Sequence, residues 1–170
     1  MIPKERVKAL NSKTVRNRHY VVYWMQQSQR VEYNHALEYA VLQANKLNRP
    51  LVVYFGLVEN FPEANIRHYQ FMLEGLKETQ RALQQRRIKL VVRRESPHAG
   101  IAKLAKNASI VIVDGGYLRI QRQWRDDVAR RISCPLVQVE SDLIVPFFDD
   151  TATTEIYALS LRDALLDYDR

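Results

Sequence analysis

The side chains best suited to ligand chemistry lie in a polar turn at residues 26–30. Gln26, Ser28 and Arg30 offer an amide, a hydroxyl and a guanidinium there. These groups can form hydrogen bonds to a planar polar ligand without reacting with it. The same composition is also typical of a solvent-exposed surface turn, and the residue types alone do not separate the two interpretations.

A second turn, at residues 114–116, combines a carboxylate with two glycines. Asp114 is followed by Gly115 and Gly116, and glycine allows a tight turn and a close approach of a ligand to the backbone. The segment does not read GxGxxG, and no Lys-Ser/Thr pair follows it, so it is neither a dinucleotide fingerprint nor a P-loop. An ordinary strand-to-helix turn is the alternative interpretation.

Other catalytic and metal-binding chemistry finds no support in the residue spacing. The 4 histidines show no metal-ligand pattern such as HExxH. The single cysteine, Cys134, excludes an internal disulfide and a multi-cysteine zinc site, and it is predicted to be a buried, inert thiol. Trp24 and Trp124 are interpreted as packing residues rather than electron carriers. Two basic series are predicted to be solvated faces: Arg86, Arg87, Lys89, Arg93 and Arg94, and then Arg119, Arg122, Arg125, Arg130 and Arg131.

Length and charge bound the class of protein. The chain has 170 residues, which suits one domain with a hydrophobic core. Its 26 basic and 19 acidic side chains give a net charge of +7, which is compatible with a polyanion such as nucleic acid nearby but does not establish one. No apolar run is long enough for a membrane helix, and the N-terminus lacks the apolar core of a signal peptide. A cytoplasmic location with no membrane partner is therefore expected.

Apolar strands alternate with amphipathic helices from residue 19 onward. Strands are predicted at residues 19–25, 51–57, 88–92, 109–113 and 136–139, and helices at residues 34–47, 66–87, 100–105 and 120–132. This alternation predicts an α/β fold: a Rossmann-like, doubly wound, five-stranded parallel sheet with helices on both faces. Ligands of such folds bind outside the carboxyl ends of the strands, where residues 26–30, 57–61, 114–119 and 140–143 would meet.

Several collinear blocks of this region resemble the class II cyclobutane pyrimidine dimer photolyases. The blocks are Tyr23-Trp24-Met25-Gln26, Ser28-Gln29-Arg30, Asn34-His35-Ala36-Leu37, residues 50–57, residues 67–76, Asp114 with Tyr117-Leu118-Arg119, and residues 137–146. The resemblance implies the N-terminal antenna domain of a two-domain flavin enzyme. In some members that domain holds a light-harvesting chromophore such as an 8-hydroxy-5-deazaflavin. A helical C-terminal domain binds FAD and the pyrimidine dimer, which is flipped out of the damaged DNA.

The resemblance and the position at the sheet edge together suggest which residues hold the chromophore. Trp24 and Met25 would flank its ring, and Gln26, Ser28 and Arg30 would hold its polar edges. Asp114 would accept a hydrogen bond from the ribityl chain or the ring. The full predicted set is Trp24, Met25, Gln26, Ser28, Arg30, Asp114, Gly115, Tyr117 and Arg119.

The segments on either side of the family-like region have their own predictions. Residues 1–18 are predicted to be a basic N-terminal arm, either mobile or forming a lone surface helix. Residues 19–146 are the photolyase-type α/β domain. Residues 147–170 depart from the family pattern and resemble translated sequencing-adapter sequence, which predicts an assembly artefact that truncates a longer gene. The alternative is a genuine tail helix that begins near Ser160.

The expected function is that of the light-harvesting domain of a class II DNA photolyase. FAD and damaged DNA would be bound through the full-length parent and its missing C-terminal FAD domain, and the chain alone is expected not to repair DNA. One alternative is a stand-alone nucleotide-binding or stress-type α/β module, which would need a phosphate-cradling glycine loop longer than residues 114–116. Another is a domain without a ligand that only binds partner proteins.

Overall fold

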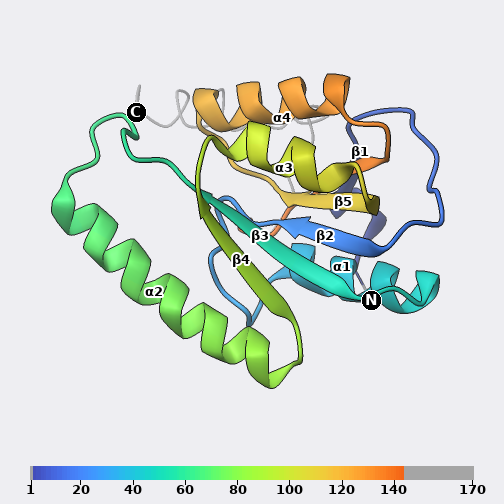
Figure 1. The fold of residues 1–170 in the computed structure, drawn as a ribbon, viewed down its shortest axis with the longest axis horizontal. Helices are drawn as coiled ribbons and strands as arrows, with labels where there is room; N and C mark the ends of the chain where they lie inside the picture. The colour runs from blue at the N-terminus through green and yellow to red at the C-terminus, as the bar shows by residue number, and fades with distance from the viewer. Residues whose placement is uncertain (1, 144–170) are drawn as a thin grey trace, which may run out of the picture.

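The structure, a computed structural model, describes residues 2–143 as a sheet with helices on both faces (Figure 1). After a 3-10 turn at Lys4–Arg6, the strands are β1 (Val7–Ala9), β2 (Tyr20–Trp24), β3 (Leu51–Leu57), β4 (Lys89–Arg94), β5 (Ala108–Asp114) and β6 (Leu136–Val139). The helices are α1 (His35–Leu47), α2 (Ile66–Gln85), α3 (Pro97–Ala105) and α4 (Arg119–Arg131). The five predicted strands and four predicted helices are all present.

The strand order is β1-β6-β5-β2-β3-β4. Neighbours from β2 to β6 pair in parallel, whereas β1 pairs with β6 in the antiparallel direction. The α/β fold class is confirmed, but the sheet is mixed and has six strands rather than five. The chain winds outward in both directions from β2, so β2 and β5 form the switch point where such sheets leave a crevice.

The extra strand corrects the prediction of a basic N-terminal arm. Val7–Ala9 pairs with β6, and the backbone N–H of Leu10 donates to the carbonyl of Leu136 at 2.8 Å. Arg6 is buried and donates to the carbonyl of Leu143 at 2.8 Å. The arm prediction failed here because a three-residue edge strand with Lys8 at its centre carries no apolar pattern.

The core lies in two layers, one on each side of the sheet. Alternate residues of β2 point to opposite faces. Val21 and Tyr23 pack with α1 and α2, whereas Val22 and Trp24 pack with α3 and α4. Burial on both faces explains why β2 reads as an uninterrupted apolar run. It also places the indole of Trp24 on the α3/α4 side.

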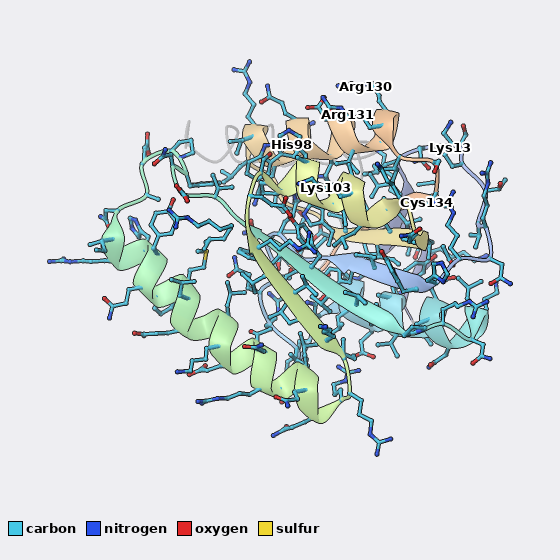
Figure 2. The ribbon with its side chains drawn as sticks, in the orientation of Figure 1. Lys13, His98, Lys103, Arg130, Arg131 and Cys134 are labelled. Carbon is cyan, nitrogen blue, oxygen red and sulfur yellow. The ribbon has the colours of Figure 1, made fainter. Side chains whose placement is uncertain are left out.

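Helix α4 exposes most of its basic side chains and buries one. Figure 2 shows Arg130 and Arg131 on the outer side of α4, and both are exposed, as predicted for a solvated face. Arg125 is 6% exposed, which contradicts that prediction for this residue. It follows Gln121 by four residues and precedes Val128 by three, so it shares the buried stripe of the helix.

The predicted tail at residues 147–170, including the alternative helix near Ser160, lies outside the described residues. Cys134 is buried, as predicted. Among residues 2–143, no helix has the length and apolar character needed to span a membrane.

Candidate functional site

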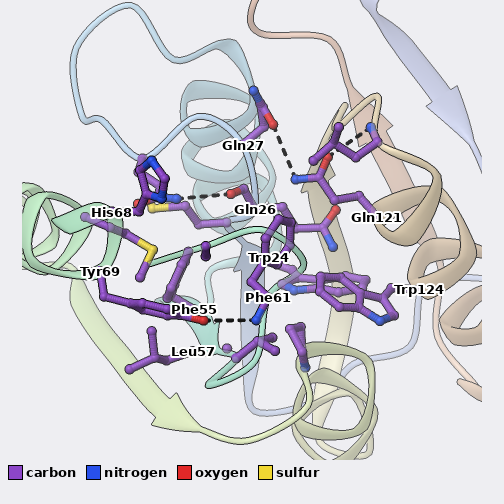
Figure 3. A pocket seen from close by; sticks show the side chains of 18 residues that line it. Trp24, Gln26, Gln27, Phe55, Leu57, Phe61, His68, Tyr69, Gln121 and Trp124 are labelled. Atoms are coloured by element: carbon purple, nitrogen blue, oxygen red, sulfur yellow. Dashed lines mark hydrogen bonds between the residues drawn. The ribbon is translucent and has the colours of Figure 1, made fainter. Parts of the chain in front are cut away.

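A cavity of about 310 Å³ opens at the carboxyl ends of β2 and β3 (Figure 3). Its size is at the lower end of the range for small-molecule sites. Most of the lining side chains are aromatic or aliphatic, and the polar ones are amides and a histidine. The lining residues are Trp24, Met25, Gln26, Gln27, Gln29, Phe55, Gly56, Leu57, Val58, Phe61, Ala64, His68, Tyr69, Met72, Pro97, Leu118, Gln121 and Trp124.

Aromatic side chains from both layers of helices form the walls. Phe61, in the loop after β3, packs edge-on against Trp124 of α4 with ring centroids 6.4 Å apart. The hydroxyl of Tyr69 on α2 accepts from the backbone N–H of Phe61 at 2.9 Å and donates to the carbonyl of Glu59 at 2.6 Å. Tyr69 therefore holds the β3–α2 loop, which carries Phe61, in place. The cavity lies between this loop and α4.

Helix α2 begins at a defined residue because its first turn is capped. The side chain of Asn65 accepts from the backbone N–H groups of Arg67 and His68, and His68 Nδ1 accepts from the backbone N–H of Asn65 at 3.1 Å. This reciprocal pair is a capping box. It holds His68 and Tyr69 at the cavity rim.

Three glutamines form much of the polar part of the lining. Gln121 Nε2 donates to Gln27 Oε1 at 3.3 Å, and Gln121 Oε1 accepts from the backbone N–H of Leu118 at 3.3 Å. Gln26 Oε1 accepts from Arg125 at 3.3 Å. Amides of this kind can recognise carbonyl, imide or hydroxyl groups on a ring.

Two buried donors in the cavity wall have no hydrogen-bond partner within the described chain. They are the indole Nε1 of Trp24, a residue with 0% exposure, and the amide Nε2 of Gln26, a residue with 8% exposure. An unsatisfied buried donor costs about 1–3 kcal/mol. Both side chains line the cavity although the two nitrogens themselves are buried, so a ligand satisfies these donors only if its acceptor atoms reach them.

Asp114 lies behind the polar turn and does not line the cavity. Its carboxylate accepts the backbone N–H groups of Gln26 at 2.8 Å, Gln27 at 2.7 Å, and Ser28. Burial raises the pKa of Asp114, and these hydrogen bonds oppose that shift. The carboxylate therefore positions the turn, and its predicted hydrogen bond to a ligand stays a prediction.

Ser28 and Arg30 face the segment after β6 rather than the cavity. Ser28 Oγ donates to Asp142 at 2.8 Å. Arg30 forms an ion pair with Asp142 at 3.0 Å and donates to the carbonyl of Ser141 at 2.8 Å. These contacts tie the polar turn to the end of β6.

The other predicted residues of the second turn also lie outside the lining. The hydroxyl of Tyr117 donates to the carboxylate of Glu140, and burial together with this bond raises the tyrosine pKa. A Cβ at Gly115 would lie 2.9 Å from Glu140 Oε2, so glycine leaves room for that carboxylate. Arg119 is exposed at the start of α4. Of the nine predicted residues, the cavity brings together Trp24, Met25 and Gln26.

Several lining residues were not among the predicted site residues. Phe61, His68, Tyr69 and Gln121 were not singled out as ligand contacts, and Trp124 was interpreted as a packing residue. A signal was available for Phe61, because residues 57–61 were expected at the ligand-facing edge. The lining contains no carboxylate, lysine, arginine or thiol, and the described residues contain no cluster that could hold a metal. The cavity is suited to non-covalent binding.

Comparison with known sequences identifies the family. The DNA photolyase family model matches residues 21–160. A deoxyribodipyrimidine photo-lyase from Methanothermobacter thermautotrophicus is 50% identical over 147 residues, which cover 86% of this chain and 33% of that protein. The protein of the same name from Potorous tridactylus is 33% identical over 150 residues, covering 86% of this chain and 28% of that protein. The chain thus spans about a third of the length of these relatives.

Solved structures share the fold at low sequence identity. A functionally unknown protein from Pseudomonas aeruginosa PAO1 aligns with a TM-score of 0.51 at 10% identity, over 77% of this chain and 51% of that one. A putative universal stress protein from Pseudomonas aeruginosa UCBPP-PA14 gives a TM-score of 0.53 at 10% identity, over 77% of this chain and 51% of that one. These similarities concern the fold alone. The family model matches residues 21–160, which are most of this chain, so the chain belongs to the DNA photolyase family.

Proposed function

We propose that this chain is the light-harvesting domain of a class II DNA photolyase and that its cavity binds an antenna chromophore of the 8-hydroxy-5-deazaflavin type. The observation that carries the proposal is the pairing of aromatic walls with two unpartnered buried donors, Trp24 Nε1 and Gln26 Nε2. A flat ring with polar atoms along one edge matches that combination.

The residues present fit such a chromophore. Phe61, Tyr69 and Trp124 offer aromatic surface to a planar ring, and aromatic pairs of this kind favour offset or edge contacts. The buried donors of Trp24 and Gln26 match ring carbonyl or ionised hydroxyl oxygens. No charged side chain lines the cavity, which suits a ring bound largely by burial of apolar surface.

In this role the protein binds and orients rather than reacts. When bound, a deazaflavin supplies strong absorption of light and passes its excitation energy to a flavin. The side chains of this chain would hold the ring in one orientation and exclude water from it. Rigid positioning is provided by the Tyr69 contacts to the β3–α2 loop and by the capping box of α2.

FAD and damaged DNA belong to the wider proposal. The relatives named deoxyribodipyrimidine photo-lyase are about three times as long as the matched segment. We assign the binding of FAD and of the flipped pyrimidine dimer to the part of such an enzyme that this match does not cover. A dimer has to leave the DNA stack before its reacting bonds become accessible.

Titration of the purified chain with 8-hydroxy-5-deazaflavin tests the proposal. We expect saturable binding with a shift of the chromophore absorption band, measured by absorbance and by equilibrium dialysis. Phe61→Ala should weaken binding by about tenfold, because it removes an aromatic wall. Phe71→Ala is the matched control, since Phe71 is 82% exposed and does not line the cavity. A folded chain that binds ATP but not the deazaflavin would favour the nucleotide-binding alternative.

A further inference from the structure

We propose that Arg125 is a positioning residue that makes the polar end of the cavity a hydrogen-bond donor site. The site would then select ligands whose buried edge carries carbonyl or ionised oxygen atoms and reject edges that carry N–H groups. This inference rests on the proposed function, because it concerns the same cavity. Beyond that function, Arg125, which does not line the cavity, would determine which chemical groups the edge of the ligand can carry.

The orientation of the Gln26 amide follows from its partner. Arg125 Nη1 donates to Gln26 Oε1 at 3.3 Å, and a guanidinium has donors but no acceptor. The flipped amide would bring its own N–H groups against those donors. Gln26 must therefore keep its oxygen toward Arg125, which leaves Nε2 as the group without a partner.

Arg125 is itself held in place. It is 6% exposed, and its other terminal nitrogen donates to the carbonyl of Gly116 at 2.6 Å. Burial lowers the pKa of Arg125, while the nearby Asp114 carboxylate opposes that shift. The same carboxylate accepts the backbone N–H of Gln26 at 2.8 Å. Arg125 is thus anchored to the turn between β5 and α4, and Gln26 is anchored to the end of β5.

The second unpartnered group has the same polarity. The indole N–H of Trp24 can only donate. Two buried donors close together in sequence, with no carboxylate in the cavity lining, favour an oxygen that carries negative charge. A ligand with an ionisable hydroxyl on this edge should therefore bind better in its ionised form than in its neutral form.

A double-mutant cycle in the full 170-residue chain tests the inference. The variants are Gln26→Met, Arg125→Met and the double variant, and the readout is the pH at which bound 8-hydroxy-5-deazaflavin ionises, followed by absorbance. We expect binding to the unsubstituted chain to lower that pH by about one unit, a tenfold preference for the ionised form. Each single substitution should remove most of the shift, and Arg125→Met should add nothing once Gln26 is Met.

The cycle separates positioning from a direct effect of charge. If Arg125→Met lowers the preference further in the Gln26→Met background, Arg125 acts on the ligand through its charge and the inference is overturned. Arg122→Met is the matched control, because Arg122 is an exposed arginine of the same helix, and it should change nothing. If Arg125→Met does not fold, Gln26→Glu replaces it. The carboxylate still accepts from Arg125 but removes the donor, so unchanged affinity would overturn the inference.

Two further probes distinguish failure here from failure of the proposed function. Fluorenone presents a carbonyl oxygen and no N–H group, whereas aminofluorene, which has a similar size and is also uncharged at neutral pH, presents an amino group. Selection of fluorenone over aminofluorene that disappears in Arg125→Met supports the inference even if the deazaflavin does not bind. Deazaflavin binding with an additive cycle leaves the proposed function standing and refutes the inference. A folded chain that binds none of the three ligands refutes both.

Discussion

Asp114 determines the shape of the polar turn although it does not line the cavity. Its carboxylate accepts hydrogen bonds from the backbone N–H groups of three successive residues, Gln26, Gln27 and Ser28. Consecutive N–H groups that converge on one anion form a compact anion-binding turn. The side chain of Gln26 is therefore placed by a residue 88 positions later in the chain.

Removal of this carboxylate should destabilise the whole domain. Asp114→Ala leaves three N–H groups without their acceptor, and we expect the free energy of unfolding to fall by about 3 kcal/mol. Urea denaturation followed by circular dichroism measures the change. Asp126→Ala is the control, because Asp126 is exposed on α4. Equal stability of the two variants would contradict this role.

The free energy of unfolding should depend on pH through the ionisation of Asp114. Burial raises its pKa above the ordinary value of 3.8, so the folded protein holds this proton to a higher pH than the unfolded chain. The contribution of the group to stability is then greatest below pH 3.8 and declines as the pH rises through the folded-state pKa. Asp114→Asn should remove that decline. Urea midpoints measured from below pH 3.8 to neutrality provide the comparison, and identical slopes would refute it.

The predictability of the site differs from residue to residue for a physical reason. Trp24, Met25 and Gln26 could be predicted because the end of a central strand always faces the crevice of a doubly wound sheet. Phe61 and Trp124 could not, because their meeting depends on how a loop and a helix far apart in sequence pack together. Arg125 was misread because the other arginines of α4 are exposed, and only its helical phase distinguishes it from them.

Helix α1 is joined to the polar turn through its N-cap. The side-chain oxygen of Asn34 accepts from the backbone N–H of Leu37 at 2.9 Å. Its amide group donates to the hydroxyl of Tyr23 and to the carbonyls of Ser28 and Arg30. Asn34 is 1% exposed, so its own side-chain amide would be buried without partners if these hydrogen bonds were lost.

The two asparagine caps should differ in their energetic importance. Asn34→Ala removes a cap, three hydrogen bonds donated by the amide and one accepted from Ser141, and we expect it to cost about 3 kcal/mol of unfolding free energy. Asn65→Ala removes only the exposed cap of α2 and should cost about 1 kcal/mol. Urea denaturation of both variants gives the comparison. A larger cost at Asn65 would show that the network around Asn34 contributes little.

Element boundaries were predictable where the chain is buried on both faces. The predicted limits of β3 and β6 agree with the structure, and those of β2 and β5 differ from it by one residue at each end, because continuous apolar runs end at polar turns. Strand β1 escaped prediction because three residues with a central lysine have no periodicity to detect. Its pairing is set by the edge that β6 offers, which is a tertiary effect.

At the scale of the whole molecule, β1 covers the edge of β6 and is itself the short edge strand on that side of the sheet. The backbone N–H of Leu10 points to β6, and alternate N–H groups of a strand point the same way, so the N–H of Lys8 also faces β6. An uncovered edge strand invites pairing with other chains. The first residues of this chain therefore protect the sheet as well as extending it.

Substitutions at Lys8 distinguish a paired strand from a basic arm. Lys8→Pro removes a ladder donor and should lower the unfolding free energy by about 2 kcal/mol and promote self-association. Lys8→Gln removes only the charge and should leave both properties unchanged. Thermal denaturation and light scattering measure them. If the charge substitution proved the more harmful, the segment would be acting as a basic arm.

The positions of the two tryptophans give the protein a built-in optical reporter. The chain has 2 tryptophans, and Trp24 and Trp124 both line the cavity. All indole emission from this chain therefore originates at the cavity wall, and an absorbing ligand placed there would quench it by accepting the excitation. Ultraviolet light captured by either indole would likewise be delivered to the bound molecule, so the protein itself would widen the range of wavelengths that reach the ligand.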